Sequence, residues 1–485
     1  MMKKVHPYLF LFLFALSGTP LFAQTESNLP DGNFIQYMRG VVSFHPFSRQ
    51  ADLELDMAEA KLRKARGSFD PNLYGDYDDK EYEGSNYWDV GEIGIELPTR
   101  TGIKVKSAYT WNQGSFLDNR ETIPAQGQGV LGVSVPLGNG LLIDPKRAEL
   151  RQAQIGIEMG DIKQILLLND LLWQAGMAYW DVQSTVSLQK RLAEAEGRAL
   201  VRFQAIREGY LQGAYAVADT LDAYNQWKQF SIQNLQAIGE RQEQSLLLNA
   251  FTWNEQGRNV ENDSLSEDLD SFSRFGDVFY SATNQRLLAI QDHPALRLSN
   301  TKINQLDVDR KLAREQLKPT LNLNYNMLTG KDAFPAQGQS AEMQEILDLN
   351  LNQNYKWGLE ASFPIFMRKA RGKVDIANIK LETEQLNLKQ KEIDLTNKLK
   401  AQIQVLAALE GQLELQEELT QNLERLLRIE EARLSVGESD LFVINSREQK
   451  LISAQQKLIV LQRKFHVTQL KTLWTAGLLP EVIGF

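Results

Sequence analysis

Two aspartates near one end of a predicted helix, Asp219 and Asp222, are the residues of this sequence best placed to act as a pair. They stand three positions apart, which puts both carboxylates on one face of a helix. They follow a glycine, Gly213, at which the chain is expected to turn. Carboxylates gathered in one place repel one another, so such a cluster can oppose close packing. The ordinary alternative is a solvated helix face.

Other residue types that could do chemistry form no constellation. Of the four histidines, His45 and His293 precede prolines, His6 lies near the N-terminus and His466 stands alone in a helical stretch. No two of them have the spacing of metal ligands. No serine or aspartate has an evident base partner, and neither a phosphate loop nor a dinucleotide fingerprint is present. We therefore expect no enzyme activity, no metal and no cofactor.

The composition excludes further classes of protein. The 485-residue chain has no cysteine, which excludes a disulfide framework, a thiol nucleophile and a thiolate metal site. Its formal net charge is −9 and no cluster of Lys and Arg stands out. Because phosphate binding needs a basic face, we expect no nucleic-acid partner.

The first residues have the pattern of a secretory signal peptide, predicted for 1–23. Lys3 and Lys4 precede the apolar stretch Tyr8–Leu16, and Ala23 follows a region of small residues. No later apolar run is long enough to span a membrane as a helix. The mature chain is therefore expected to be exported, and to enter any membrane as β-structure.

The chain contains an internal duplication. Landmarks of the first part of the chain return later at two uniform sequence shifts. One shift relates His45-Pro46 to His293-Pro294 and Pro71 to Pro319, and the other relates Arg147 to Arg371 and Gly213 to Gly437. Uniform shifts over long stretches indicate that one supersecondary unit was copied. We predict a first repeat over 24–253, an acidic connector over 254–285 and a second repeat over 286–485.

Each repeat is expected to start with a short helix and then form strands, over about 71–137 in the first repeat and 320–365 in the second. In Thr320–Met327 and Tyr355–Ile365 apolar and polar residues alternate strictly, which predicts strands with one apolar and one polar face. Aromatic residues collect near the strand ends, as at a membrane interface. Alternation alone is also compatible with a half-buried sheet of a soluble protein.

An additional hairpin is predicted over Asp89–Trp111 in the first repeat only. Its arms carry alternating apolar residues, and Pro98–Gly102 has the composition of the turn. Glu92 and Glu96 could oppose Lys104 and Lys106 across the pair. The sequence leaves open whether this hairpin joins a sheet or projects from it.

Very long helices follow the strands, over about 143–250 and 369–478. Leu, Ala, Gln, Glu, Lys and Arg predominate there, and the leucines of the second region keep the spacing of a coiled-coil seam. Each region is interrupted once, at Glu208–Gly213 and at Val436–Asp440. Glycine at these places predicts a turn that returns the chain as an antiparallel helix.

The order and duplication of these motifs resemble the TolC-like outer-membrane efflux protein family over nearly all of the mature sequence. The matching elements are two Pro-then-strand segments, two strands that end at a proline and two tip motifs. They are Asp70–Leu73 and Lys318–Leu323, Val135–Leu137 and Phe363–Ile365, and Gly213–Ala223 with Arg433–Ser439.

The resemblance implies an α+β membrane protein that assembles as a homotrimer in the outer membrane, with a long periplasmic extension. Each chain would give four strands to a shared twelve-stranded β-barrel and its long antiparallel helices to a periplasmic α-helical barrel. The additional hairpin departs from this four-strand pattern. Open sheet edges agree with the oligomer, because lipid does not tolerate unpaired strand edges.

The function that the resemblance implies is the exit duct of a tripartite efflux or type I secretion system. The duct would passively conduct substrates delivered by an inner-membrane transporter, driven by protons or by ATP, through a periplasmic adaptor (membrane fusion protein). A non-conducting coiled-coil envelope scaffold or adhesin is the alternative, but it would need no lipid-facing strands. An outer-membrane protease or lipase would need a nucleophile constellation that is missing.

Two sets of site residues follow from the resemblance. Acidic rings would constrict the closed periplasmic end and favour cations, and their candidates are Asp219 and Asp222, or Asp440 from the second repeat. The positions of the second repeat that match the aspartate pair are Val443 and Ser446.

The tips of the helical hairpins would contact the adaptor. Here the candidates are Gly209, Gly213, Val436 and Gly437. Simple helix-turn glycines are the alternative, and it is compatible with docking.

Overall fold

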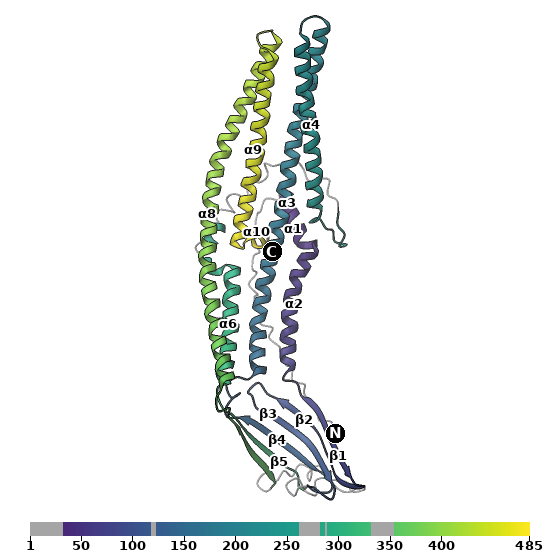
Figure 1. The fold of residues 1–485 in the computed structure, drawn as a ribbon, viewed down its shortest axis with the longest axis vertical. Helices are drawn as coiled ribbons and strands as arrows, with labels where there is room; N and C mark the ends of the chain where they lie inside the picture. Colours follow the sequence, from purple (N-terminus) through teal and green to yellow (C-terminus); the bar gives the residue numbers. More distant parts are fainter. Residues whose placement is uncertain (1–32, 118–122, 261–281, 287–288, 331–353) are drawn as a thin grey trace, which may run out of the picture.

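The computed structural model describes residues 33–117, 123–260, 282–286, 289–330 and 354–485. The predicted signal peptide and much of the acidic connector lie outside these residues. The molecule is elongated, with a sheet at one end and two pairs of long antiparallel helices that extend from it (Figure 1). Both helix pairs end in turns at the far end of the molecule.

One sheet contains strands from both repeats, in the order β1-β2-β3-β4-β5-β6, and every neighbouring pair is antiparallel. The strands are β1 (Asn72–Tyr82), β2 (Ser85–Pro98), β3 (Lys104–Gln113), β4 (Gln128–Pro136), β5 (Thr320–Leu328) and β6 (Tyr355–Ser362). The two repeats meet where β4 pairs with β5.

The expectation of four strands per chain is therefore wrong, because the sheet of the described residues has six. The predicted hairpin over 89–111 forms most of β2 and β3, which lie between β1 and β4. Charge pairing across the hairpin supports this position, since the Lys106 Nζ lies 2.6 Å from Glu92 Oε1. The Nζ of Lys104 lies 3.3 Å from Glu96 Oε1 in the same hairpin.

The strand register gives the sheet one apolar and one polar face. Because side chains alternate along a strand, residues that pair in one row across the sheet share a face. One apolar row consists of Leu73, Ile95, Ser107, Leu131, Met327 and Tyr355, and the next of Leu97, Val105, Val133, Tyr325 and Trp357. A row of the opposite face consists of Asn72, Glu96, Lys106, Gly132, Asn326 and Lys356.

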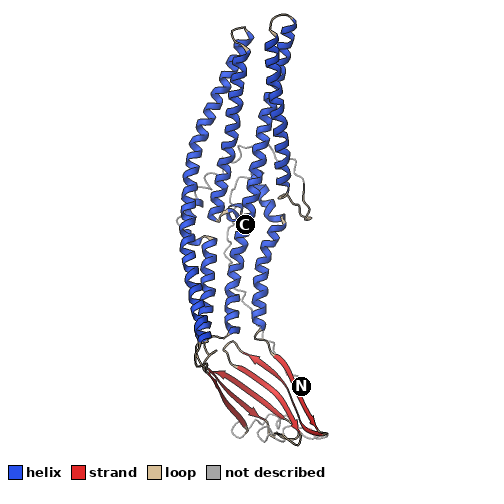
Figure 2. Ribbon diagram, in the orientation of Figure 1, coloured by secondary structure: helices blue, strands red, loops and turns tan. Residues whose placement is uncertain are grey.

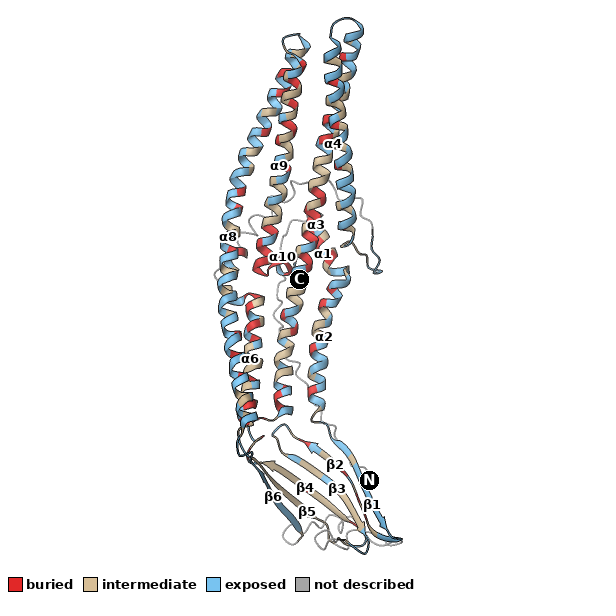
Figure 3. Ribbon diagram, in the orientation of Figure 1, coloured by how far each residue is buried: buried red, intermediate tan, exposed pale blue. Residues whose placement is uncertain are grey.

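The apolar face is not covered by another part of the described chain. Leu73 is 71% exposed and Trp357 is 63% exposed, and the helices leave one end of the sheet rather than packing across it (Figures 2 and 3). A large exposed apolar surface of this kind indicates contact with lipid or with another chain.

In the described part of the chain the long helices form two hairpins, and shorter helices lie beside them. The bounds are α1 (Asn33–Phe44), α2 (Pro46–Gly67), α3 (Pro145–Leu211), α4 (Val217–Asn249), the short 3-10 helix η2 (Ile290–Asp292), α6 (Pro294–Glu315), α8 (Arg368–Ser435), α9 (Leu441–Ala476) and α10 (Leu479–Ile483). Helices α3 and α4 form one hairpin and α8 and α9 the other, while α2 packs on α3 and α6 packs on both α3 and α8. In the part of the chain that the structure describes, no helix has the length and apolar character needed to cross a membrane.

The repeated His-Pro pairs begin equivalent helices. The Nδ1 atom of His45 accepts a hydrogen bond from the backbone N–H of Phe47 at 3.1 Å, and His293 Nδ1 accepts one from Ala295 at 3.0 Å. In both helices the following proline is the first residue, where its missing N–H costs nothing. Each histidine is thus a side-chain N-cap, which explains why the dipeptide occurs twice.

The main hydrophobic core lies halfway along the helices (Figure 3). Trp180 of α3 is 1% exposed there, and the ring of His466 from α9 stacks on it with centroids 4.2 Å apart. The edge of Tyr179 packs on the same tryptophan. Burial lowers the pKa of His466 to about 4, because the charged imidazolium would lose its hydration.

Replacing His466 with Phe should make the stability of the protein less dependent on pH. In the native protein the unfolded chain takes up a proton near pH 6.5 and the folded chain only near pH 4, so the neutral ring stabilises the fold fully above pH 6.5. That contribution falls by about 3 kcal/mol as the pH drops through this window. The difference between native and His466→Phe unfolding free energies, measured from pH 7 to pH 4, should show this slope; parallel curves would contradict it.

Candidate functional site

The two tips of the helical hairpins lie at the end of the molecule farthest from the sheet (Figure 1). At the α3–α4 tip, Ala214 N–H donates to Gly209 O at 2.8 Å and Gly213 N–H donates to Tyr210 O at 2.9 Å. At the α8–α9 tip the same two bonds join Glu438 to Arg433 and Gly437 to Leu434, at 2.9 and 3.0 Å. Both tips therefore use one glycine-ended helix turn, the Schellman motif.

The candidate glycines have conformational reasons to be glycine. Gly213 and Gly437 have φ of 77° and 76°, in the left-handed region that other residues adopt at a cost. Gly209 has an ordinary helical conformation, but a Cβ atom there would lie 2.6 Å from the ring of Tyr215. These contacts account for the three glycines by local structure alone, and they leave docking at the tips untested.

Apolar side chains project from both tips. Val436 is 69% exposed at the end of α8, and Phe442, at the start of α9, is 81% exposed. At the other tip Leu211 is 69% exposed and Val217 is 55% exposed. Such exposed apolar residues indicate a contact surface.

The candidate aspartates lie at helix starts next to the tips. Asp219 Oδ2 accepts a hydrogen bond from the N–H of Ala216 at 2.9 Å, and Asp440 Oδ1 accepts one from Val443 at 2.9 Å. Both carboxylates therefore satisfy helix N-termini, a structural role that the sequence analysis did not assign. Asp222 lies one turn further along α4 and is exposed.

A buried ion cluster close to the tips was missed by the sequence analysis. Glu448 of α9 is completely buried, and its carboxylate lies 2.7 Å from Arg202 Nη1 and 3.1 Å from Arg198 Nε. Arg202 also donates to Asn445 Oδ1 at 3.2 Å and lies 3.8 Å from Glu431. The cluster joins α3 of one repeat to α8 and α9 of the other.

The sequence held a weak signal for this cluster. Arg198 and Arg202 are four positions apart on one helix face, which is typical of a shared partner. Their partner lies about 250 positions away in the sequence, so helix periodicity cannot identify it. Glu448 alone resembles an ordinary surface residue of a charged helix.

Within the described residues there is no group of three or more metal-ligating side chains close enough to hold a metal ion. The pocket near the start of α3, lined by Pro98, Gly102 and Asp144 among others, lies at the junction of sheet and helices. This pocket is far from the tips and adds no group to them.

Comparison with known proteins identifies the class of the fold. The structure is similar to the CmeC outer membrane channel of Campylobacter jejuni, with 13% sequence identity, a TM-score of 0.63 and coverage of 92% of this chain and 85% of that one. It is also similar to the open-state MtrE outer membrane channel of Neisseria gonorrhoeae, with 13% identity, a TM-score of 0.64 and coverage of 92% and 88%. The fold is thus that of outer-membrane channels with long helices.

The sequence supports the same class. Residues 287–474 match the model of the outer membrane efflux protein family. No curated protein matches the chain. This match over the second repeat agrees with the predicted TolC-like family, and the predicted fold class is confirmed by the similar solved structures.

Replacing Glu448 with Gln should destabilise the contact between the two helix pairs by about 3–5 kcal/mol, the usual cost of removing one partner from a buried ion pair. The substitution keeps the volume of the side chain but leaves Arg202, whose side chain is only 11% exposed, without its carboxylate. Unfolding in denaturant measures the effect.

The matched control is Glu424→Gln on α8. Glu424 is 51% exposed and its oxygen lies 4.0 Å from Arg428, so its loss should cost less than about 1 kcal/mol. Equal effects of the two substitutions would show that the cluster does not hold the repeats together.

Proposed function

We propose that three copies of this chain form the exit duct of a tripartite efflux or type I secretion system. The sheets close into a barrel in the outer membrane, and the helices continue the channel through the periplasm. The observation that carries this proposal is a sheet with one uncovered apolar face joined directly to helices of 67 and 68 residues. At 1.5 Å per residue these helices reach about 100 Å, enough to cross much of a periplasm.

The edges of the sheet support closure by further copies. β1 and β6 are the outer strands, and nearly all residues of β1 and all residues of β6 are exposed. Their backbone groups need partners in lipid, where no water can satisfy them. Since the number of strands is even, β6 of one chain meets β1 of the next in antiparallel orientation, as the rest of the sheet requires.

The helices also carry surfaces that suit a neighbouring copy. Apolar residues of α8 that one chain leaves exposed recur at intervals of seven. They are Ile379, Leu386 and Ile393. Helix α4 exposes Ile232, Leu235 and Leu246, whose intervals of three and eleven positions also place them on one side of the helix. Apolar stripes with this spacing pack against other helices, which supports an α-helical barrel made of several chains.

The exposed apolar tips support docking of a periplasmic adaptor. In this proposal the turns at Gly213 and Gly437, with Gly209 and Val436 beside them, present the contact surface. The adaptor links the duct to an inner-membrane transporter driven by protons or by ATP. Selection of the cargo lies with that transporter, and the duct conducts passively.

The aspartates next to the tips form the proposed gate. Three copies bring several carboxylates together at one level, from Asp219 and Asp222 and from Asp440. Such rings attract cations and repel one another, so contacts between the helices must restrain them. The buried cluster of Glu448 with Arg198 and Arg202 is one contact that can do so.

The double substitution Asp219→Asn, Asp222→Asn should lower the cation selectivity of the channel in planar bilayers. Asparagine removes the charge, while its carbonyl oxygen can still accept the hydrogen bond that Asp219 receives from Ala216. Block by a trivalent metal-ammine cation should weaken on the order of tenfold, or about 1.4 kcal/mol.

The control is Asp56→Asn, an exposed aspartate of α2 far from the tips. It should leave selectivity and block unchanged. Unchanged block in the double variant would remove these aspartates from the gate. No conductance from native, membrane-inserted protein would instead support the non-conducting scaffold.

A further inference from the structure

Among the residues that the structure describes, the first repeat has a pair of strands with no counterpart in the second repeat. Between β1 and β4 the chain inserts β2 and β3, whereas β5 is followed along the sheet by β6 alone. A family pattern of four strands per chain leaves no place for this pair. Whether it belongs to the membrane wall therefore decides the width of the pore.

The backbone pairing puts the inserted hairpin inside the sheet. β2 pairs with β1 from Asn72 opposite Glu96 to Tyr82 opposite Ser85. On its other side β3 pairs with β4 from Lys104 opposite Ser134 to Thr110 opposite Gln128. A projecting hairpin would leave β1 and β4 as neighbours, but the structure separates them by two strands.

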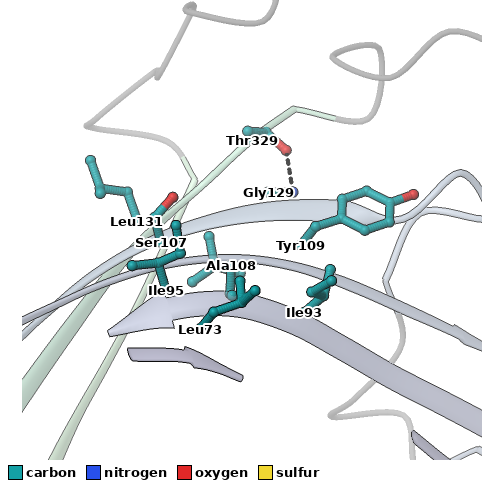
Figure 4. A pocket seen from close by; sticks show the side chains of 11 residues that line it. Leu73, Ile93, Ile95, Ser107, Ala108, Tyr109, Gly129, Leu131 and Thr329 are labelled. Atoms are coloured by element: carbon teal, nitrogen blue, oxygen red, sulfur yellow. Dashed lines mark hydrogen bonds between the residues drawn. The ribbon is translucent and has the colours of Figure 1, made fainter. Parts of the chain in front are cut away.

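The two faces of the sheet continue through the inserted hairpin. Ile93 and Ile95 of β2 lie on the same face as Leu73 of β1 and Leu131 of β4, where they line one shallow depression together with Tyr109 (Figure 4). They are about half exposed, at 50% and 49%. Apolar residues that are half exposed on this one face fit a lipid-facing wall.

The opposite face of the hairpin is charged. Glu92 lies 2.6 Å from Lys106 and accepts a hydrogen bond from the Tyr74 hydroxyl, and Glu96 lies 3.3 Å from Lys104. Charged side chains of this kind are costly in lipid and suit a water-filled lumen. The two signs are balanced, so this part of the wall does not select solutes by charge.

The turn of the hairpin is fixed to the helical part of the chain. Arg147, at the start of α3, is only 10% exposed at its side chain and lies 2.8 Å from Asp144. Its guanidinium also donates to the backbone oxygens of Thr101, in the β2–β3 turn, at 3.4 Å, and of Leu141 at 3.2 Å. The hairpin is therefore held at the same junction as the other strands.

From these observations, and resting on the proposed duct, we propose that each chain contributes six strands to the membrane wall, so that a trimer closes a pore of eighteen strands. With strands about 4.8 Å apart and tilted by about 40°, eighteen strands close a circle about 36 Å across between backbones, against about 24 Å for twelve. The pore admits polar solutes that are too wide for a twelve-stranded wall. It is lined in part by the paired charges of the inserted hairpin.

Engineered disulfides test the position of the hairpin in the native trimer, since the chain has no cysteine of its own. The pair Ser107→Cys, Leu131→Cys joins directly opposed residues of β3 and β4 and should oxidise to a disulfide. The pair Leu73→Cys, Leu131→Cys should not, because two strands place these positions about 14 Å apart. The reverse result, a disulfide only between positions 73 and 131, would overturn the proposal.

Strand counting and pore size complete the test. Cryo-electron microscopy of the trimer in lipid nanodiscs should show eighteen wall strands, and twelve would overturn the proposal. Neutral polymers of graded size, added from the outer side, should enter the native pore at larger sizes than they enter a twelve-stranded channel, because its lumen is wider by about 12 Å. An equal limit would also contradict the wider wall.

A variant without residues 85–113 provides the matched narrow pore. Removal of the two strands preserves the faces, because Leu73 and Leu131 stand in one register row on either side of them. The largest polymer that enters it should be smaller, because its lumen should be narrower by about 12 Å. If it fails to fold, the strand count of the native trimer decides. A native protein that forms no pore removes the proposed function, whereas a pore with twelve strands removes this inference alone.

Discussion

The need to pair every backbone N–H and C=O group of a sheet in lipid governs the whole molecule. A single chain leaves β1 and β6 with one unpaired edge each, and it leaves the apolar face of the sheet uncovered. Neither defect can be repaired within the described chain, because the helices leave the sheet at one end (Figure 1). In the proposed assembly several copies close the sheet, and the even strand number makes each new junction antiparallel.

The helical part meets the same constraint in another form. Its largest buried core lies halfway along the helices, around Trp180, while towards the tips the two helix pairs are joined by the ion cluster of Glu448 and by a small apolar cluster of Ile206, Ala223 and Leu441. An ion pair tolerates smaller shifts of the helices than an apolar contact does, since its attraction is lost when the charged groups move apart by a few ångströms. In the proposed gate, the tips would separate by breaking these local contacts while the core around Trp180 stays packed.

Periodicity and punctuation in the sequence predicted the parts of the fold that depend on local rules. The alternation in Thr320–Met327 identified a strand, and the glycines at 213 and 437 identified the tip turns, because both depend on neighbouring residues only. The partners of Arg198 and Arg202 could not be predicted, since they lie some 250 positions away. The placement of the hairpin was open for the same reason: alternation reports that a strand has two faces, but not which strand lies beside it.

A closed sheet can be enlarged only in particular ways, and the inserted hairpin is the smallest of them. One extra strand would reverse the direction of every later strand and leave two parallel neighbours at a junction; two strands keep both the antiparallel order and the faces. The helices need no matching insertion, because the β2–β3 turn reaches back to the start of α3 and is held there by Arg147. In the predicted duplication each repeat holds a strand pair with its helical hairpin, and two strands added to one repeat would widen the proposed membrane wall without changing the number of helices below it.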